Sequence, residues 1–69
     1  MLVRVDDHGL VDDLCLHYRR SGFEAQSVGG GMVEVSRPDA PTPEQERHDV
    51  LSHLRVWQIA NPEVRAELL

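Results

Sequence analysis

Residues 23–36, with the sequence FEAQSVGGGMVEVS, form the segment on which the fold prediction rests. On both sides of Gly29–Gly31 apolar and polar residues alternate, as they do in half-buried strands. Glycine accepts the positive φ angles that tight turns between antiparallel strands require. The segment therefore predicts a β-hairpin with strands over Phe23–Val28 and Met32–Ser36.

A first helix is predicted before the hairpin. Apolar residues recur there at helical spacing and define one face: Leu10, Val11, Leu14, Cys15 and Tyr18. Asp6 and Asp7 precede this run and are suited to cap the first turn by accepting from its free amides. Gly22 is suited to end the helix in a left-handed conformation.

A second helix is predicted after the loop Arg37–Pro41. Thr42 is a favourable N-cap, Pro43 fits the first helical position, and Gln45 completes a capping box. The helix should end near Asn61, because a proline follows it. Its apolar face comprises Val50, Leu51, Leu54 and Trp57.

The two ends of the chain complete the expected order. Leu2–Val5 is rich in β-branched residues and predicts a strand. Glu63–Leu69 is ambiguous, because its alternating apolar residues suit a strand but Asn61–Glu63 is also an acceptable helix start. The order of the preceding elements favours the strand. With a final strand, the order gives an α+β fold of the ferredoxin-like βαββαβ type. We expect one domain over residues 1–69, a four-stranded antiparallel sheet with two helices on one face.

Composition limits the classes of partner. The net charge of −5 and the absence of aromatic residues at the expected outward positions of the central strands argue against nucleic acid. Those outward positions are Leu2, Arg4, Met32, Glu34 and Ser36, and Arg4 is expected to pair with Glu34. The apolar runs are too short for a membrane span, and Asp6 and Asp7 come too early in the chain for a signal peptide. A lone cysteine suits a reducing compartment, so a cytoplasmic location is expected. All seven basic side chains are arginine, a usage that favours a bacterial origin.

The candidate chemical groups favour structural roles, so we expect no enzyme, cofactor or metal. Each candidate nucleophile lacks a recognisable catalytic motif. Three acid–histidine pairs at helical spacing are expected to be solvated neighbours, with metal binding and pH sensing as alternatives: Glu44–His48, Asp49–His53 and Asp13–His17. The triple glycine joins two strands, whereas a phosphate loop leads into a helix.

One segment resembles a known family. Val5–Val11, with the sequence VDDHGLV, followed by Gly22 and Phe23, resembles the first strand, turn and helix of ACT-type amino-acid-sensing domains. The resemblance covers about a third of the chain and departs in the hairpin, which is shorter here. It implies a small-ligand site at a dimer interface, lined by Asp6, Asp7, His8, Gly9 and Leu10. The general layout is also similar to small bacterial signal-transducing domains, a likeness of fold that does not specify function.

Three apolar residues lie off the predicted core faces of the helices: Leu16, Val56 and Ile59. On two adjacent helices they are suited to form one patch, which is more typical of an interface. Coverage by the C-terminal segment and isolated surface positions are the alternatives. We therefore expect a non-enzymatic interaction or regulatory module, a homo-oligomer or an accessory to another protein, with small-ligand sensing as the alternative.

Overall fold

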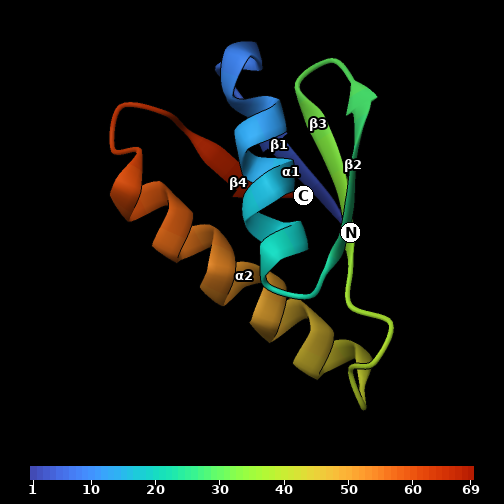
Figure 1. The fold of residues 1–69 in the computed structure, drawn as a ribbon. Helices are drawn as coiled ribbons and strands as arrows, with labels where there is room; N and C mark the ends of the chain where they lie inside the picture. Colours follow the sequence, from blue (N-terminus) through green and yellow to red (C-terminus); the bar gives the residue numbers. More distant parts are fainter.

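The structure, a computed structural model, describes all of residues 1–69. Figure 1 shows the chain alternating between the sheet and the helices that cover it. Its elements in chain order are β1 (Leu2–Val5), the 3-10 turn η1 (His8–Leu10), α1 (Val11–Arg20), β2 (Glu24–Gly29), β3 (Met32–Ser36), α2 (Pro43–Ala60) and β4 (Ala66–Leu68).

The strands form one antiparallel sheet in the order β2-β3-β1-β4. This order confirms the predicted ferredoxin-like arrangement, with the first strand and the second hairpin strand at the centre. The strand alternative for the C-terminal segment is also confirmed, but the strand covers only Ala66–Leu68. A turn closed by the Val64 amide donating to the Asn61 carbonyl (3.1 Å) comes first and shortens it.

Both helices pack on the same face of the sheet (Figure 1). Alternate residues of the central strands point into this layer, and Val3, Val33 and Val35 are fully buried there. The core comprises Val3, Val5, Val11, Leu14, Cys15, Tyr18, Phe23, Ala25, Val33, Val35, Val50, Leu54, Trp57 and Val64. Leu10 and Leu51, both predicted for the core, are only partly buried.

The starts of the helices depart in part from the predicted caps. Thr42 caps α2 as expected, with its Oγ1 accepting from the Gln45 amide at 3.0 Å. The Gln45 side chain does not return to Thr42 and instead donates to Asp49, so the capping box is half formed. Asp7 caps η1 and not α1, which begins without a side-chain cap.

The hairpin turn is the two-residue loop Gly30–Gly31, with φ angles of 64° and 75°. Positive φ at both central positions is the requirement of a type I′ turn, whose twist matches that of the strands it joins. A register shift between Ser27 and Gly29 adds a bulge on β2 just before the turn.

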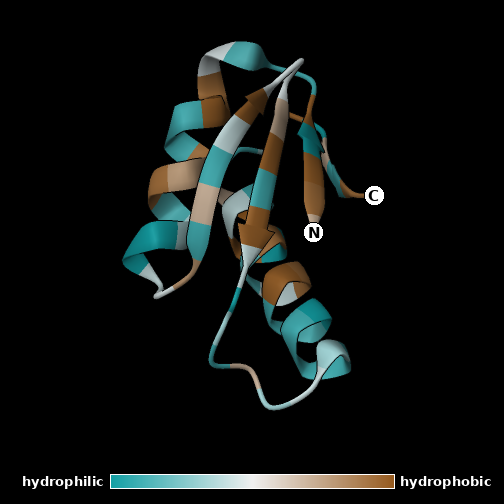
Figure 2. Ribbon diagram, turned by 90° about the vertical axis from the view of Figure 1, so that its right-hand side faces the viewer, coloured by the Kyte–Doolittle hydropathy of each residue, from teal (hydrophilic) through white to brown (hydrophobic).

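The opposite face of the sheet has no helix on it, and Figure 2 shows its strands banded between apolar and polar. The predicted outward residues of β1 and β3 do face this side, but the predicted Arg4–Glu34 pair is wrong. The register places Glu34 opposite Leu2, so Arg4 forms an ion pair with Glu67 on β4. Glu34 instead accepts from the amino group of Met1 at 3.0 Å. Neither helix has the combination of length and apolar character needed to cross a bilayer.

Candidate functional site

The outer face of the helix layer carries the three apolar residues singled out from the sequence. Leu16 is 43% exposed, Val56 61% and Ile59 80%. The C-terminal segment does not cover them, because it enters the sheet as β4 and pairs with β1. The coverage alternative is therefore wrong, and all three side chains face solvent in the single chain.

A shallow groove between α1 and α2 links Leu16 to the apolar end of α2. Its volume is about 250 Å³, and it is lined by Asp13, Leu16, His17, Arg20, Ser21, Trp57, Ala60 and Asn61. Ala60 lies one helical turn after Val56 and next to Ile59, so it continues the apolar surface from the groove onto α2. We call Leu16, Val56, Ile59 and Ala60 the helix-face patch.

Inside the groove, the indole of Trp57 holds the two helices in register. Its Nε1 donates to Oδ2 of Asp13 at 2.8 Å, while its ring is buried. A buried tryptophan requires such an acceptor for its N–H group. The Trp57 indole therefore forms part of the groove and ties together the two helices that carry the patch.

Charged residues of both signs surround the patch. Arg20 and Arg55 form no ion pair within the chain, and Asp12, exposed on α1, forms none either. An apolar centre with a polar, solvent-accessible rim is the usual composition of an interface. The patch thus has a composition that can complement a surface of similar character.

The turn after β1, which the ACT resemblance singles out, is held by its own carboxylates. Asp7 Oδ1 accepts from the Gly9 amide at 2.9 Å, and Asp6 Oδ1 accepts from the Arg65 amide at 2.9 Å. The imidazole of His8 is exposed. Leu10 is half-buried against the core. The five turn residues therefore do not converge on one point.

A cavity of about 640 Å³ lies beside this turn. It is lined by Arg4, Val5, Asp6, His8, Gly30, Gln58, Pro62, Val64, Arg65, Ala66 and Glu67. Asp6 and His8 are the only members of the predicted ligand turn that border it. Arg4 is engaged with Glu67, whereas Arg65 forms no ion pair. The cavity thus presents the guanidinium of Arg65 and the imidazole of His8 to a small polar ligand.

Gly31 is a residue of this region whose role the sequence did not predict. It is buried, and a Cβ at this position would lie 2.6 Å from His8 Nε2 and 2.7 Å from the Val5 carbonyl oxygen. The hairpin tip therefore packs directly against the turn after β1. Only glycine allows this approach, so the tip and the turn form one rigid unit.

None of the three predicted acid–histidine pairs forms an ion pair, and two of the rings bond to backbone carbonyls. His53 Nδ1 donates to the backbone carbonyl of Asp49, and His17 Nε2 donates to the backbone carbonyl of His53, both at 2.9 Å. The two carboxylates have other partners, since Asp13 accepts from Trp57 and Asp49 from Arg37. His17 thus bridges α1 to α2, whereas the ring of His53 bonds within α2. No ion pair joins the exposed His48 to an acid.

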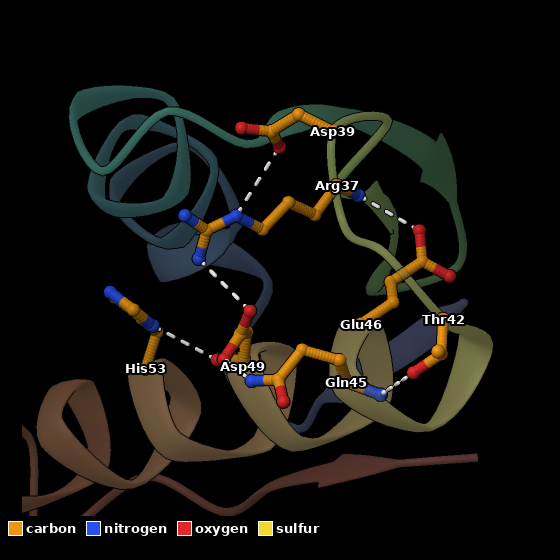
Figure 3. Close-up of polar contacts among 7 residues, drawn as sticks. All are labelled: Arg37, Asp39, Thr42, Gln45, Glu46, Asp49 and His53. Atoms are coloured by element: carbon orange, nitrogen blue, oxygen red, sulfur yellow. Dashed lines mark hydrogen bonds and ion pairs between the residues drawn. The ribbon is translucent and has the colours of Figure 1, made fainter.

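Arg37 organises the loop between β3 and α2 (Figure 3). Its guanidinium pairs with Asp39 at 3.3 Å and Asp49 at 3.1 Å, and it lies 5.3 Å from the centre of the Phe23 ring. Its backbone amide donates to Glu46 Oε2 at 2.9 Å. The sequence did not predict this cluster, which fixes the start of α2 against the sheet.

The nucleophilic and titratable groups of the core have structural roles. Burial raises the pKa of the Cys15 thiol, so the thiol stays protonated and unreactive near neutral pH. Burial likewise raises the pKa of Tyr18 well above its usual value, and the hydroxyl donates to the Val50 carbonyl at 2.8 Å. No three side chains of the metal-binding types His, Cys, Asp and Glu come together.

Compared with known proteins, the chain matches no family model, no curated sequence and no solved structure. The resemblance to ACT-type domains therefore rests on the residues around the first turn. What the chain does must be argued from the helix-face patch and from the cavity beside that turn.

Proposed function

We propose that the chain is a small non-enzymatic interaction or regulatory module that self-associates through its helix-face patch. The observation that carries the proposal is the exposure of Leu16, Val56 and Ile59 on two helices held in register. Clustered apolar side chains on a rigid surface are more typical of an interface than of a free surface.

A second copy of the same chain is the occupant that the charges favour. Around the patch lie unpaired arginines, Arg20 and Arg55, and an unpaired acid, Asp12. A two-fold axis through the patch brings such residues of one copy toward those of the other, so opposite charges can meet without a foreign partner. A domain of this size also gains stability from association, because its own core is small.

The single chain is compact enough to exist as a folded monomer. Its exposed surface of 4409 Å² is close to the roughly 4,400 Å² expected for a folded protein of its mass. A standard interface buries about 800 Å² of each partner. Association through the helix face should therefore be reversible, with a folded monomer on the dissociated side.

The test is the solution mass of the wild type and of the double variant Leu16→Glu/Ile59→Glu, measured by light scattering. Each new glutamate lies one turn from an arginine, Arg20 or Arg55, so the helices should tolerate the charges. The matched control is Val28→Glu/Leu69→Glu, which adds the same charge at exposed apolar positions off the patch. We expect a wild-type oligomer that only the helix-face variant converts to a folded monomer. A monomeric wild type, or equal dissociation in the control, would rule out the proposed interface.

Small-ligand sensing is the second candidate, supported by the cavity beside the first turn. Its lining joins Asp6, His8 and the unpaired Arg65, groups suited to a ligand with both carboxylate and amino functions. A thermal-shift screen with amino acids tests this function, because a ligand at 100 times its Kd stabilises by about 2.7 kcal/mol. A shift that Arg65→Ala abolishes would support it. No shift with any amino acid would reject it.

We further propose a cytoplasmic location in a bacterium. The support is a single free cysteine, which suits a reducing compartment, together with the exclusive use of arginine as the basic residue.

A further inference from the structure

The outer edge of β4 exposes backbone groups that can be identified from the pairing with β1. The Asp6 amide donates to the Arg65 carbonyl, and the Leu69 amide donates to the Leu2 carbonyl. Because backbone groups alternate direction along an antiparallel strand, Val64, Ala66 and Leu68 direct theirs away from β1. Such an edge is a template on which another strand can add.

The side-chain amide of Gln58, from the last turns of α2, occupies part of this edge. Its Oε1 accepts from the Ala66 amide at 2.9 Å, and its Nε2 donates to the Val64 carbonyl. The Nε2 also donates to the Asn61 carbonyl at 2.9 Å. The carboxamide thus takes both the Ala66 donor and the Val64 acceptor that the backbone of an added strand would otherwise use.

The opposite edge, on β2, is covered in a similar way. The Val35 amide donates to the Met1 carbonyl, so Val35 faces β1 and its partner Ala25 directs its backbone groups outward. Arg19 of α1 reaches over this edge, and its Nε donates to the Ala25 carbonyl at 2.8 Å. The bulge that begins at Ser27 interrupts the rest of the edge.

We infer that Gln58 and Arg19 are edge locks, which keep the sheet from pairing with the edge strand of a second copy. Arg19 comes from α1 and Gln58 from α2. Each side chain bonds to an outward backbone group of an edge strand, Ala25 on β2 or Ala66 on β4, to which an added strand would otherwise bond. The added strand would come from a second copy because, without Arg19, β2 is itself an edge strand whose outward Ala25 groups have no partner. This inference is independent of the helix-face proposal, since it concerns edges that the patch does not touch.

Hydrogen exchange in the wild type provides the first test. The Ala66 and Leu68 amides both point away from β1, but only the Ala66 amide is bonded to a helix side chain. We expect the Ala66 amide to exchange on the order of tenfold more slowly than the Leu68 amide, relative to their intrinsic rates. Equal protection factors would overturn the assignment of Gln58 as a lock.

Variants provide the second test, carried out in the Leu16→Glu/Ile59→Glu background so that helix-face association does not contribute. Gln58→Met and Arg19→Met keep the length of each side chain and remove the bonds. Gln26→Met and Arg47→Met are the matched controls, because both original side chains are exposed and neither bonds to a sheet edge.

The combined variant Gln58→Met/Arg19→Met should form oligomers in an amount that increases with protein concentration. Its Leu68 or Ser27 amide should become newly protected from hydrogen exchange, while the control variants remain monomeric. A combined lock variant that stays monomeric at millimolar concentration would overturn the inference, even if the Ala66 amide exchanges faster. Should the combined variant fail to fold, the single variants make the same comparison one edge at a time.

Discussion

Replacing Gly31 by alanine tests whether the hairpin tip and the first turn pack as one unit. Alanine at a φ of 75° costs about 1–2 kcal/mol of backbone strain. The new Cβ would also lie 2.7 Å from the Val5 carbonyl oxygen and 2.6 Å from His8 Nε2. The His8 imidazole can rotate away from the new Cβ. The Val5 carbonyl cannot move in the same way, because the Val5 amide donates to the Gly31 carbonyl and holds the strand beside the turn. Overpacking of this kind adds about 1–3 kcal/mol.

The control is Gly30→Ala, because Gly30 has a φ of 64° and no atom within 4 Å of the added Cβ. It should lower the free energy of unfolding by the strain alone, about 1–2 kcal/mol. Gly31→Ala should lower it by about 2–5 kcal/mol in total. A domain of 69 residues has about 3.5–10 kcal/mol of stability. The Gly30→Ala variant should therefore be folded, and the Gly31→Ala variant should be close to unfolding.

Urea denaturation, followed by the fluorescence of the single tryptophan, Trp57, measures both variants. Thermal melts give an independent reading, since each 1 kcal/mol lowers Tm by about 4–8 °C in a domain of this size. His8→Ala in the Gly31→Ala background should recover only part of the loss, because the Val5 contact remains. Equal destabilisation by the two glycine variants would refute the close packing of the tip against the turn.

Three further predictions concern the core and the start of α2. Burial raises the folded-state pKa of Tyr18, so the unfolded state releases the phenol proton first and the free energy of unfolding should fall as the pH rises above about 10. Tyr18→Phe should remove this fall in a series of urea denaturations at increasing pH, and should cost about 1 kcal/mol at neutral pH because the bond to Val50 is lost. Arg37→Ala should destabilise by about 1–3 kcal/mol, because the half-buried Asp49 loses its charged partner, whereas Arg47→Ala, at an exposed position without an ion pair, should change the urea midpoint little. Thr42→Ala should lower the free energy of unfolding by about 0.5–2 kcal/mol, because the bond from the Gln45 amide to the N-cap is lost. Thr42→Ser should retain most of the stability, and an alanine variant as stable as the wild type would contradict the capping role of Thr42.

Local patterns were sufficient to predict the hairpin and both helices. Alternation around Gly29–Gly31 specified the hairpin, and helical spacing specified the core faces of both helices. The C-terminal strand followed from the order of elements, because alternation in the last residues alone left a helix open. The hairpin and the helices could be predicted because each depends on neighbours in the sequence. The last strand required the order of all the elements.

Side-chain partners were predicted less well, because they depend on register and on the reach of long side chains. Arg4 bonds to Glu67 because the strand register places Glu34 two residues away from the expected position. Asp49 is four residues before His53, yet the guanidinium of Arg37 takes its carboxylate. The bonds of Gln58 to β4 join two elements whose relative position only the tertiary structure defines.

The candidate site was predicted in part. The exposure of Leu16, Val56 and Ile59 follows from the helical projection and is confirmed. The groove between Leu16 and Ala60 could not be predicted, because it depends on how far apart the two helices pack. Their role as an interface remains a prediction, as does ligand binding at the turn over Asp6–Leu10.

The most direct test of the central proposal is a map of amide chemical shifts on dilution, from millimolar to micromolar wild-type protein. If the chain self-associates through the helix-face patch, the concentration-dependent shifts should be confined to residues around Leu16 and the Val56–Ala60 turn. Residues on the open face of the sheet, such as Glu34, should not move. Spectra that are identical at all concentrations, with a mass that stays at 7.8 kDa, would contradict the proposal, and so would shifts centred on β2.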